Sequence, residues 1–327
     1  SGGNYNTVVG DEAGTALTTG DQNTAVGFEA LKTATTAGNN TALGFKSLRL
    51  NTTGNANVAV GVVALGANTT AVDNTAVGYN SLGANTTGDR NTALGRNSLA
   101  SNVDGDRGVA VGYDALSSQD PSSNVDMYNT AVGYSAGGAV TTGIQNTLIG
   151  GLAGDAITTG ANNVALGQAA LGTNTTGSRS TAIGTGALAA HNVTNSSNTY
   201  NTAVGHTAGT AVTTGVENTL IGGLAGDAIT TASNNTVVGS SALGATTTGA
   251  DNTAIGWKAS QNGTTGTDNT ATGAQALRTN TTGNKNTALG RYALYLNTTA
   301  DNNTAVGYSA LLANTTGTQN VAVGTFA

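Results

Sequence analysis

Residues 74–90 read NTAVGYNSLGANTTGDR, and close variants of this 17-residue stretch follow one another along the whole chain. The opening segment starts at 19 positions: 6, 23, 40, 57, 74, 91, 108, 129, 146, 163, 180, 201, 218, 235, 252, 269, 286, 303 and 320. Sixteen of the 18 spacings are 17 residues, and the other two, from 108 to 129 and from 180 to 201, are 21. A fixed period of this kind marks a repeat architecture. We number the positions of each unit as slots 1 to 17, so that Asn74 is slot 1 and Arg90 is slot 17.

The distribution of glycine predicts the fold class. Slot 5 is glycine in every unit, and glycine usually returns at slot 15. No amphipathic helix fits this spacing, so each unit is expected to hold about two short strands and two turns. Stacked units then form an all-β parallel β-solenoid, or β-roll, of about 19 coils. The array is expected to run as one continuous domain over residues 1–327, with four-residue insertions near 117–126 and 192–198 that form surface loops.

The strand at slots 2–4 carries apolar residues at two adjacent positions. Slot 4 is nearly always Val, Leu or Ile, and slot 3 is mostly Ala. Neighbouring strand residues face opposite sides, so both faces of this strand are expected to be buried. We expect slot 4 to point into the coil. The alanine face is then expected to approach another chain closely, as around a three-fold axis.

Slots 9 and 12 exchange their apolar residue. Slot 9 is Leu in 12 units, and eight of these have Asn at slot 12, as in Leu82 and Asn85. Five units have glycine at slot 9, and slot 12 is then aliphatic; the pairs are Gly14 with Leu17, Gly137 with Val140, Gly154 with Ile157, Gly209 with Val212 and Gly226 with Ile229. This compensation of volume predicts a packed interior.

Composition narrows the function classes. Only 9% of the residues are charged and the net charge is −6, with no basic stripe, so no nucleic-acid partner is expected. There is no cysteine, and no apolar run is long enough to span a bilayer. His191 and His206 occupy unremarkable slots, and the acidic residues are scattered. The sequence therefore predicts no enzyme, no cofactor and no metal site, calcium included.

The repeat resembles a known class of surface proteins. The segment from Asn74 to Gly78, followed by Ser81 and Leu82, is similar to the head repeats of YadA-like trimeric autotransporter adhesins. It is also similar to the N-T-A-x-G-Y-x-A-L arrays of phage tail-fibre-like proteins. The resemblance covers essentially the whole chain, and it implies a trimeric left-handed β-roll that presents an adhesive surface. The adhesin head repeat is shorter, near 14 residues, and lacks the added Asn-Thr-Thr-Gly turn.

Three sets of residues are candidate sites. Slot 6 holds seven of the 13 aromatic residues, a candidate surface ladder for stacking glycans or a partner fibre: Phe28, Phe45, Tyr79, Tyr113, Tyr134, Trp257 and Tyr308. The alternative is that these rings shield a corner or line a seam between chains. Seven Asn-Thr-Thr triplets match the N-glycosylation pattern, at Asn51, Asn68, Asn85, Asn174, Asn280, Asn297 and Asn314. The alternative there is an asparagine ladder within stacked turns. The threonines at slots 13 and 14 form the third set, a candidate ice-binding array.

These features together predict a structural protein of the cell surface, the extracellular space or a virion fibre. The expected partner is a second copy of the chain, in a trimer or in a head-to-tail filament joined through uncapped solenoid ends and the doubly apolar strand. An adhesive role toward glycans or a host cell surface accompanies this hypothesis. One alternative is the receptor- or glycan-binding head or shaft of a trimeric adhesin or phage tail fibre. A further alternative is an ice-binding solenoid.

Overall fold

The computed structural model describes residues 3–195 and 197–327. Ser196, inside the second predicted insertion, lies outside the described residues. The chain is an all-β parallel β-solenoid of 19 turns, and the described residues contain no helix. Its contacts divide it into two compact units, Ser1–Asn163 and Val164–Ala327. The predicted fold class and repeat length are thus confirmed.

Each coil contributes one strand of three residues, formed by slots 2–4. The first unit holds β1 (Thr7–Val9), β2 (Thr24–Val26), β3 (Thr41–Leu43), β4 (Val58–Val60), β5 (Thr75–Val77), β6 (Thr92–Leu94), β7 (Val109–Val111), β8 (Thr130–Val132) and β9 (Thr147–Ile149). The second unit holds β10 (Val164–Leu166), β11 (Thr181–Ile183), β12 (Thr202–Val204), β13 (Thr219–Ile221), β14 (Thr236–Val238), β15 (Thr253–Ile255), β16 (Thr270–Thr272), β17 (Thr287–Leu289), β18 (Thr304–Val306) and β19 (Val321–Val323). The prediction of two strands per unit was wrong, because the rest of each coil is built of turns.

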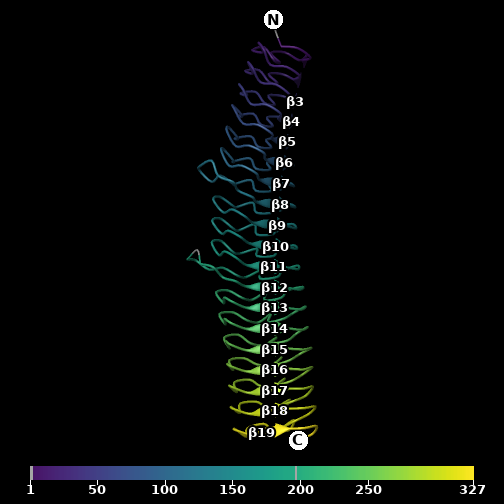
Figure 1. Ribbon diagram of the computed structural model, residues 1–327, viewed down its shortest axis with the longest axis vertical. Coiled ribbons are helices and arrows are strands. Elements are labelled where there is room, and N and C mark those ends of the chain that lie inside the picture. Colours follow the sequence, from purple (N-terminus) through teal and green to yellow (C-terminus); the bar gives the residue numbers. More distant parts are fainter. Residues whose placement is uncertain (1–2, 196) are drawn as a thin grey trace. The chain divides into compact units, whose positions relative to one another are not determined.

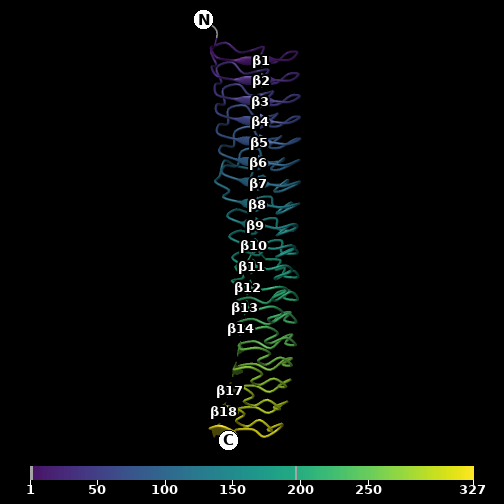
Figure 2. The same cartoon turned by 90° about the vertical axis from the view of Figure 1, so that its right-hand side faces the viewer.

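Identical slots stack directly on one another. Within each unit, every strand pairs in parallel with the strand of the next coil, and slot 2 faces slot 2 throughout. Figures 1 and 2 show the strands following one another along one side of the coils of each unit. Neighbouring parallel strands lie roughly 4.8 Å apart. A residue type repeated at one slot therefore forms a row along the unit.

The coil corners depend on left-handed backbone positions. In the β5 coil, Gly78 has a φ of 135°, and a Cβ there would lie 2.6 Å from the carbonyl oxygen of Gly95 in the next coil. Only glycine fits this approach, which explains its presence at slot 5 of every unit. Slots 7, 9 and 17 of the same coil also have positive φ, at Asn80 (54°), Leu82 (49°) and Arg90 (57°). These three corners recur along the chain and bend each coil back on itself.

The interior lies behind slot 3 of the strands. Ala76 is fully buried, and slot 3 is buried in nearly every coil, whereas Val77 and its slot-4 counterparts are half-buried or exposed. The prediction that slot 4 points into the coil was therefore wrong. The buried leucines of slot 9, such as Leu82, and two rows of asparagine occupy the interior, so only a methyl group fits beneath most strands.

The exchange between slots 9 and 12 confirms the packed interior. Val140, Ile157, Val212 and Ile229 are fully buried where slot 9 is glycine. A Cβ added to Gly137 would lie 2.6 Å from Leu148 Cδ1 and 2.9 Å from Leu116 Cδ2. The space above this glycine is thus already filled by leucines of adjacent coils.

Buried asparagines form hydrogen-bonded ladders through the interior. At slot 1, the backbone N–H of Asn74 donates to Asn57 Oδ1 at 3.0 Å, and Asn74 Nδ2 donates to the carbonyl of Gly88 at 2.9 Å. At slot 12, Asn68 Nδ2 donates to Asn51 Oδ1 at 2.8 Å. Since unpaired buried amides are costly, each side chain ties its coil to the next one in a fixed register.

The two insertions leave their coils after slot 12. The first insertion coil, 108–128, places Ser122–Asn124 in exposed turns, and the second insertion coil, 180–200, exposes Thr194 and Asn195. Figure 1 shows each loop projecting beyond the neighbouring coils of its own unit. The predicted surface loops are thus present in both insertion coils.

Candidate functional surfaces

The strands present an outer sheet face, which we define as the rows at slots 2 and 4. Slot 2 is threonine in 15 coils and valine in the other four. Slot 4 is Val, Leu or Ile in every coil except that of β16, where it is Thr272. Because the strands pair in register, each unit carries a row of hydroxyl-bearing side chains beside a row of aliphatic ones.

The aliphatic row is open to solvent and free of charge. Leu43, Leu94 and Leu289 are 45%, 47% and 46% exposed. No charged residue occurs at slots 2, 3 or 4 anywhere in the chain. The other slot-4 side chains are half-buried or exposed, so the row is partly open to solvent along each unit. An exposed apolar surface commonly marks an interaction site. The aliphatic row was evident from the sequence, but the prediction from the sequence placed it on the inside of the coil.

The slot-6 column lies beyond slot 5 at the next corner of the coil. All seven predicted aromatic residues are exposed, from Phe28 at 37% to Tyr134 at 60%. In the first unit the column is continuous over seven coils: Phe28, Phe45, Val62, Tyr79, Arg96, Tyr113 and Tyr134. The structure thus brings five of the seven predicted rings into one column, with Arg96 as a member that the sequence reading missed.

The rings of this column stack on one another. The ring centroids of Phe28 and Phe45 are 5.4 Å apart with an interplanar angle of 18°, and those of Tyr113 and Tyr134 are 5.6 Å apart with 13°. The guanidinium of Arg96 lies 5.4 Å from the Tyr79 ring and 5.7 Å from the Tyr113 ring. A sugar stacks on the face of a ring, and each of these contacts covers one face of a ring that a sugar would use.

The two predicted rings of the second unit lie in different surroundings. Tyr308 packs edge-on against Tyr292 and Phe326. Trp257 is 51% exposed, and its slot-6 neighbours are the small residues Ser240 and Ala274. Lys258 Nζ lies 4.9 Å from the Trp257 ring centroid. Trp257 thus has no aromatic stacking partner among the described residues, and its one ring contact is with Lys258.

The predicted glycosylation sites are placed inside the coils. Asn51, Asn68, Asn85, Asn174, Asn280 and Asn297 are at most 1% exposed. Each donates from Nδ2 to the carbonyl three residues later, as Asn85 does to Gly88 at 3.0 Å. The folded coil therefore has no room for a glycan at these six asparagines, and only Asn314 is half-buried. These asparagines are arranged as a ladder within stacked turns, which was the alternative interpretation of the motif.

The slot-13 threonines of the Asn-Thr-Thr turns are also engaged locally, whereas slot-14 threonines such as Thr53 and Thr87 are exposed. Thr52 Oγ1 donates to the carbonyl of Thr69 at 3.0 Å, and Thr69 Oγ1 donates to that of Thr86 at the same distance. These slot-13 hydroxyls bind the backbone of the next coil. The regular array of threonines at the outer sheet face is the one at slot 2.

Shallow grooves follow slots 7, 10 and 11 in each unit. In the first unit, a groove of about 280 Å³ is lined by residues that include Lys46, Arg49 and Asn80. Glu29 lies 3.7 Å from Lys46 Nζ and 4.0 Å from Arg49, and its hydrogen bond with Lys32 lowers the pKa of its carboxyl. In the second unit, a groove of about 270 Å³ contains Asp227, whose pKa is raised by burial. Neither groove gathers groups suited to acid–base or nucleophilic catalysis.

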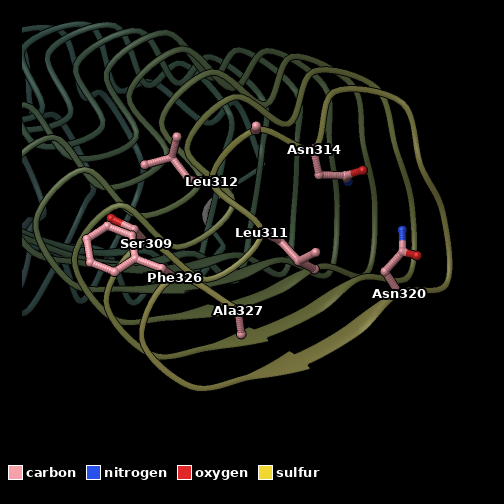
Figure 3. A pocket seen from close by; sticks show the side chains of 8 residues that line it. Ser309, Leu311, Leu312, Asn314, Asn320, Phe326 and Ala327 are labelled. Atoms are coloured by element: carbon pink, nitrogen blue, oxygen red, sulfur yellow. The ribbon is translucent and has the colours of Figure 1, made fainter.

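A hollow of about 440 Å³ opens at the last coil. Figure 3 shows Leu311, Leu312 and Phe326 around it. It is the interior of the β19 coil, which stops at Ala327. This hollow carries no argument for a ligand.

Metal-binding clusters and membrane spans were also sought in the part of the chain that the structure describes. No group of three or more His, Asp or Glu side chains is placed to hold a metal ion there. Nor does that part contain a helix with the length and apolar character needed to cross a membrane.

Comparisons with known proteins show no family for this chain. No protein-family model matches it, and no curated protein sequence matches it. The likeness to YadA-like head repeats and phage tail-fibre repeats therefore stays a prediction. The fold and the surfaces described above carry the functional argument.

Proposed function

We propose that this protein is a structural fibre component of a cell surface, the extracellular space or a virion, and that its solenoid associates laterally with further copies of itself. The observation that carries this proposal is the uncharged outer sheet face. Its exposed aliphatic row gains hydrophobic stabilisation when a second copy covers it. A parallel face with similar residues along each row can also match a second copy of itself along its length, which suits a homo-oligomer.

The association is tested by the mass of the protein in solution. The wild-type chain of 31.7 kDa is expected to sediment as an oligomer whose mass rises with concentration. The double variant Leu43→Lys/Leu94→Lys places two charges in the aliphatic row and is expected to weaken self-association at least tenfold, because burying an unpaired charge is costly. Leu43→Thr/Leu94→Thr, which introduces the residue that Thr272 already provides at the same slot, is expected to weaken it less.

The matched control is Asn39→Lys, which adds a charge at exposed slot 17, where Lys285 occurs with the same backbone conformation. This variant is expected to associate like the wild type. A wild-type protein that stays monomeric at high concentration, or lysine variants that associate normally while folded, would contradict the proposal. A stable three-chain species would favour the trimeric arrangement over an open filament.

An adhesive role is a second component of the proposal, and two features support it. The insertion loops project from the coils, and Trp257 is exposed between small slot-6 neighbours. The alternative of a receptor- or glycan-binding shaft predicts glycan binding that Trp257→Ala abolishes. Binding should survive Tyr79→Ala, because that ring lies against Arg96.

The regular threonine row at slot 2 favours one other candidate function. Flat arrays of threonine on a solenoid face order water, and here they alternate with aliphatic side chains on an uncharged surface. Ice binding through this face would appear as thermal hysteresis that is lost in Leu43→Lys/Leu94→Lys. The absence of thermal hysteresis in the wild-type protein would remove this candidate.

A further inference from the structure

His191 is a fully buried side chain in the second insertion coil. It occupies slot 12, where most other coils carry asparagine or an aliphatic residue. Its Nε2 lies 3.0 Å from Nδ2 of Asn201, which also donates to the carbonyl of Gly215 at 2.8 Å. An amide nitrogen only donates, so His191 Nε2 is the acceptor and the ring proton is on Nδ1. Nδ1 is buried and has no hydrogen-bond partner among the described residues.

Asn201 cannot turn its amide to accommodate a different ring state. Its Oδ1 accepts from the backbone N–H of Asn218 at 2.9 Å and from Asn218 Nδ2 at 3.2 Å. Asn218 continues the slot-1 ladder to Asn235. Reversing the Asn201 amide would break these bonds at the start of that ladder. The hydrogen bonds of the following coils therefore keep Asn201 Nδ2 pointed at His191, so His191 Nε2 has to act as an acceptor.

We propose that His191 is an acid-sensitive latch, whose protonation releases the second insertion coil from the asparagine ladder that begins at Asn201. Protonation adds a hydrogen to Nε2 and points it at the amide hydrogens of Asn201. The hydrogen bond is replaced by a contact between two donors, and a positive charge is left in an enclosed site. The loop that follows His191 is the segment expected to open.

In the part of the chain that the structure describes, no charged side chain faces His191 to compensate its protonation. The titratable side chains of this coil and the adjacent ones are exposed at corners and turns: Arg179, Tyr200, His206 and Glu217. Burial lowers the pKa of His191 to about 4, and the nearby Gly215 carbonyl, which can accept from the protonated ring, opposes this only in part. The opened coil titrates near the ordinary value of 6.5. Protonation therefore adds almost nothing to opening above pH 6.5. Below pH 6.5 it favours opening by about tenfold per pH unit, and the effect levels off at roughly 300-fold below pH 4.

The first insertion coil supplies an internal control. Gln119 occupies the same slot there, and its Oε1 accepts from Asn129 Nδ2 at 2.6 Å. Gln119 Nε2 donates to the carbonyls of Thr141 at 3.0 Å and Gly143 at 3.2 Å. Both insertion coils thus present an acceptor to the slot-1 asparagine of the next coil. Only the second uses an acceptor that titrates.

Hydrogen–deuterium exchange of the whole protein tests the latch. Between pH 7.5 and pH 5, after correction for intrinsic exchange, opening of the backbone over residues 180–217 is expected to rise about 30-fold, whereas residues 108–145 should change little. His191→Gln copies the first insertion coil and should remove this rise while leaving exchange at pH 7.5 within a few-fold of wild type. An equal response in both insertion coils, or a response that survives His191→Gln, would overturn the proposal.

A second measurement does not depend on any variant. Nuclear magnetic resonance of the imidazole ring should show His191 as the Nδ1–H tautomer titrating near pH 4. A His191 ring that titrates reversibly near 6.5 without local opening would sink the idea.

Discussion

The two insertion coils fill the same internal space with different side chains. They are related by an offset of 72 residues, so Gly108 corresponds to Ser180 and Met127 to Thr199. In the first coil, Met127 lies beside Gly108, where an added Cβ would be 2.7 Å from the methionine Cε. In the second, the hydroxyls of Ser180 and Thr199 hydrogen-bond to each other, and Thr199 also donates to the carbonyl of Ser178.

This difference shows what an insertion requires of the fold. The insertion interrupts the slot-1 ladder, since neither Gly108 nor Ser180 carries the amide of asparagine. The residue at the end of each loop must then fill the space. Met127 does so with an apolar side chain in the first coil, and Thr199 does so by pairing its hydroxyl with that of Ser180 in the second. Gln119 and His191 complete the closure by presenting an acceptor to the next ladder. The second coil is thereby made more polar and titratable.

The largest expected effect comes from removing the Met127 side chain, which fills the space beside Gly108. Met127→Ala leaves a cavity beside Gly108 and is expected to destabilise the first insertion coil by about 3 kcal/mol. Thr199→Ala removes hydrogen bonds of a small side chain and is expected to cost the second coil roughly 1–2 kcal/mol. Local hydrogen exchange measures each effect separately, which matters because a chain of two compact units need not unfold in one step.

A double replacement controls this comparison. Gly108→Ser combined with Met127→Thr copies the second coil into the first and should recover part of the stability that Met127→Thr alone loses. Equal losses of local stability for Met127→Ala and Thr199→Ala would show that Met127 and the Ser180–Thr199 pair do not differ as the contacts indicate.

The next largest effect comes from moving a titratable acceptor into the first insertion coil. Gln119→His places an imidazole opposite Asn129 and is expected to leave the first insertion coil nearly unchanged at pH 7.5. At pH 5 the variant should be destabilised by about 2 kcal/mol relative to wild type, because the enclosed ring resists protonation that the opened coil accepts. The pH dependence of exchange over residues 108–145 is the measurement, and a flat profile would contradict the assignment of acid sensitivity to this slot.

The smallest effect concerns the exposed pairs at the base of each loop. Arg107 forms an ion pair with Asp126 and lies 5.8 Å from the Tyr128 ring, whereas Arg179 donates to the Tyr200 hydroxyl at 3.1 Å. Arg107→Ala and Arg179→Ala are each expected to cost less than about 1 kcal/mol, since exposed ion pairs contribute little. Only the Arg107 effect should shrink in high salt, as followed by exchange of the loop amides.

Much of the fold was predictable because the sequence repeats. A strict period places equal residues on equal positions of successive coils, so the count of coils, the in-register stacking and the loop positions follow from spacing alone. The exchange between Gly137 and Val140 also indicated a filled interior without any coordinates. The single strand per coil was not predictable from these patterns, because turns held by interior asparagines replace the second strand.

The orientation of the strand was decided only by the tertiary structure. Alternation states that slots 3 and 4 face opposite sides, but both are apolar, so it does not say which is inside. A signal was present: Leu148 and Leu220, the large residues at slot 3, occur in the coils of Gly154 and Gly226. A Cβ on either glycine would lie 2.8–2.9 Å from that leucine, which shows that slots 3 and 9 share one interior.

The sequence by itself thus determined the repeat, its register and the need for constant internal volume, because these are properties of a period. The tertiary structure decided which side of each row meets solvent. It turned six glycosylation motifs into a buried ladder and an expected interior row into the outer sheet face. It also placed His191, whose slot is unremarkable in the sequence, in the interior as a hydrogen-bond acceptor. The physical reason is that solvent exposure depends on what lies across the coil, and residues 14 or 17 positions away supply that neighbour.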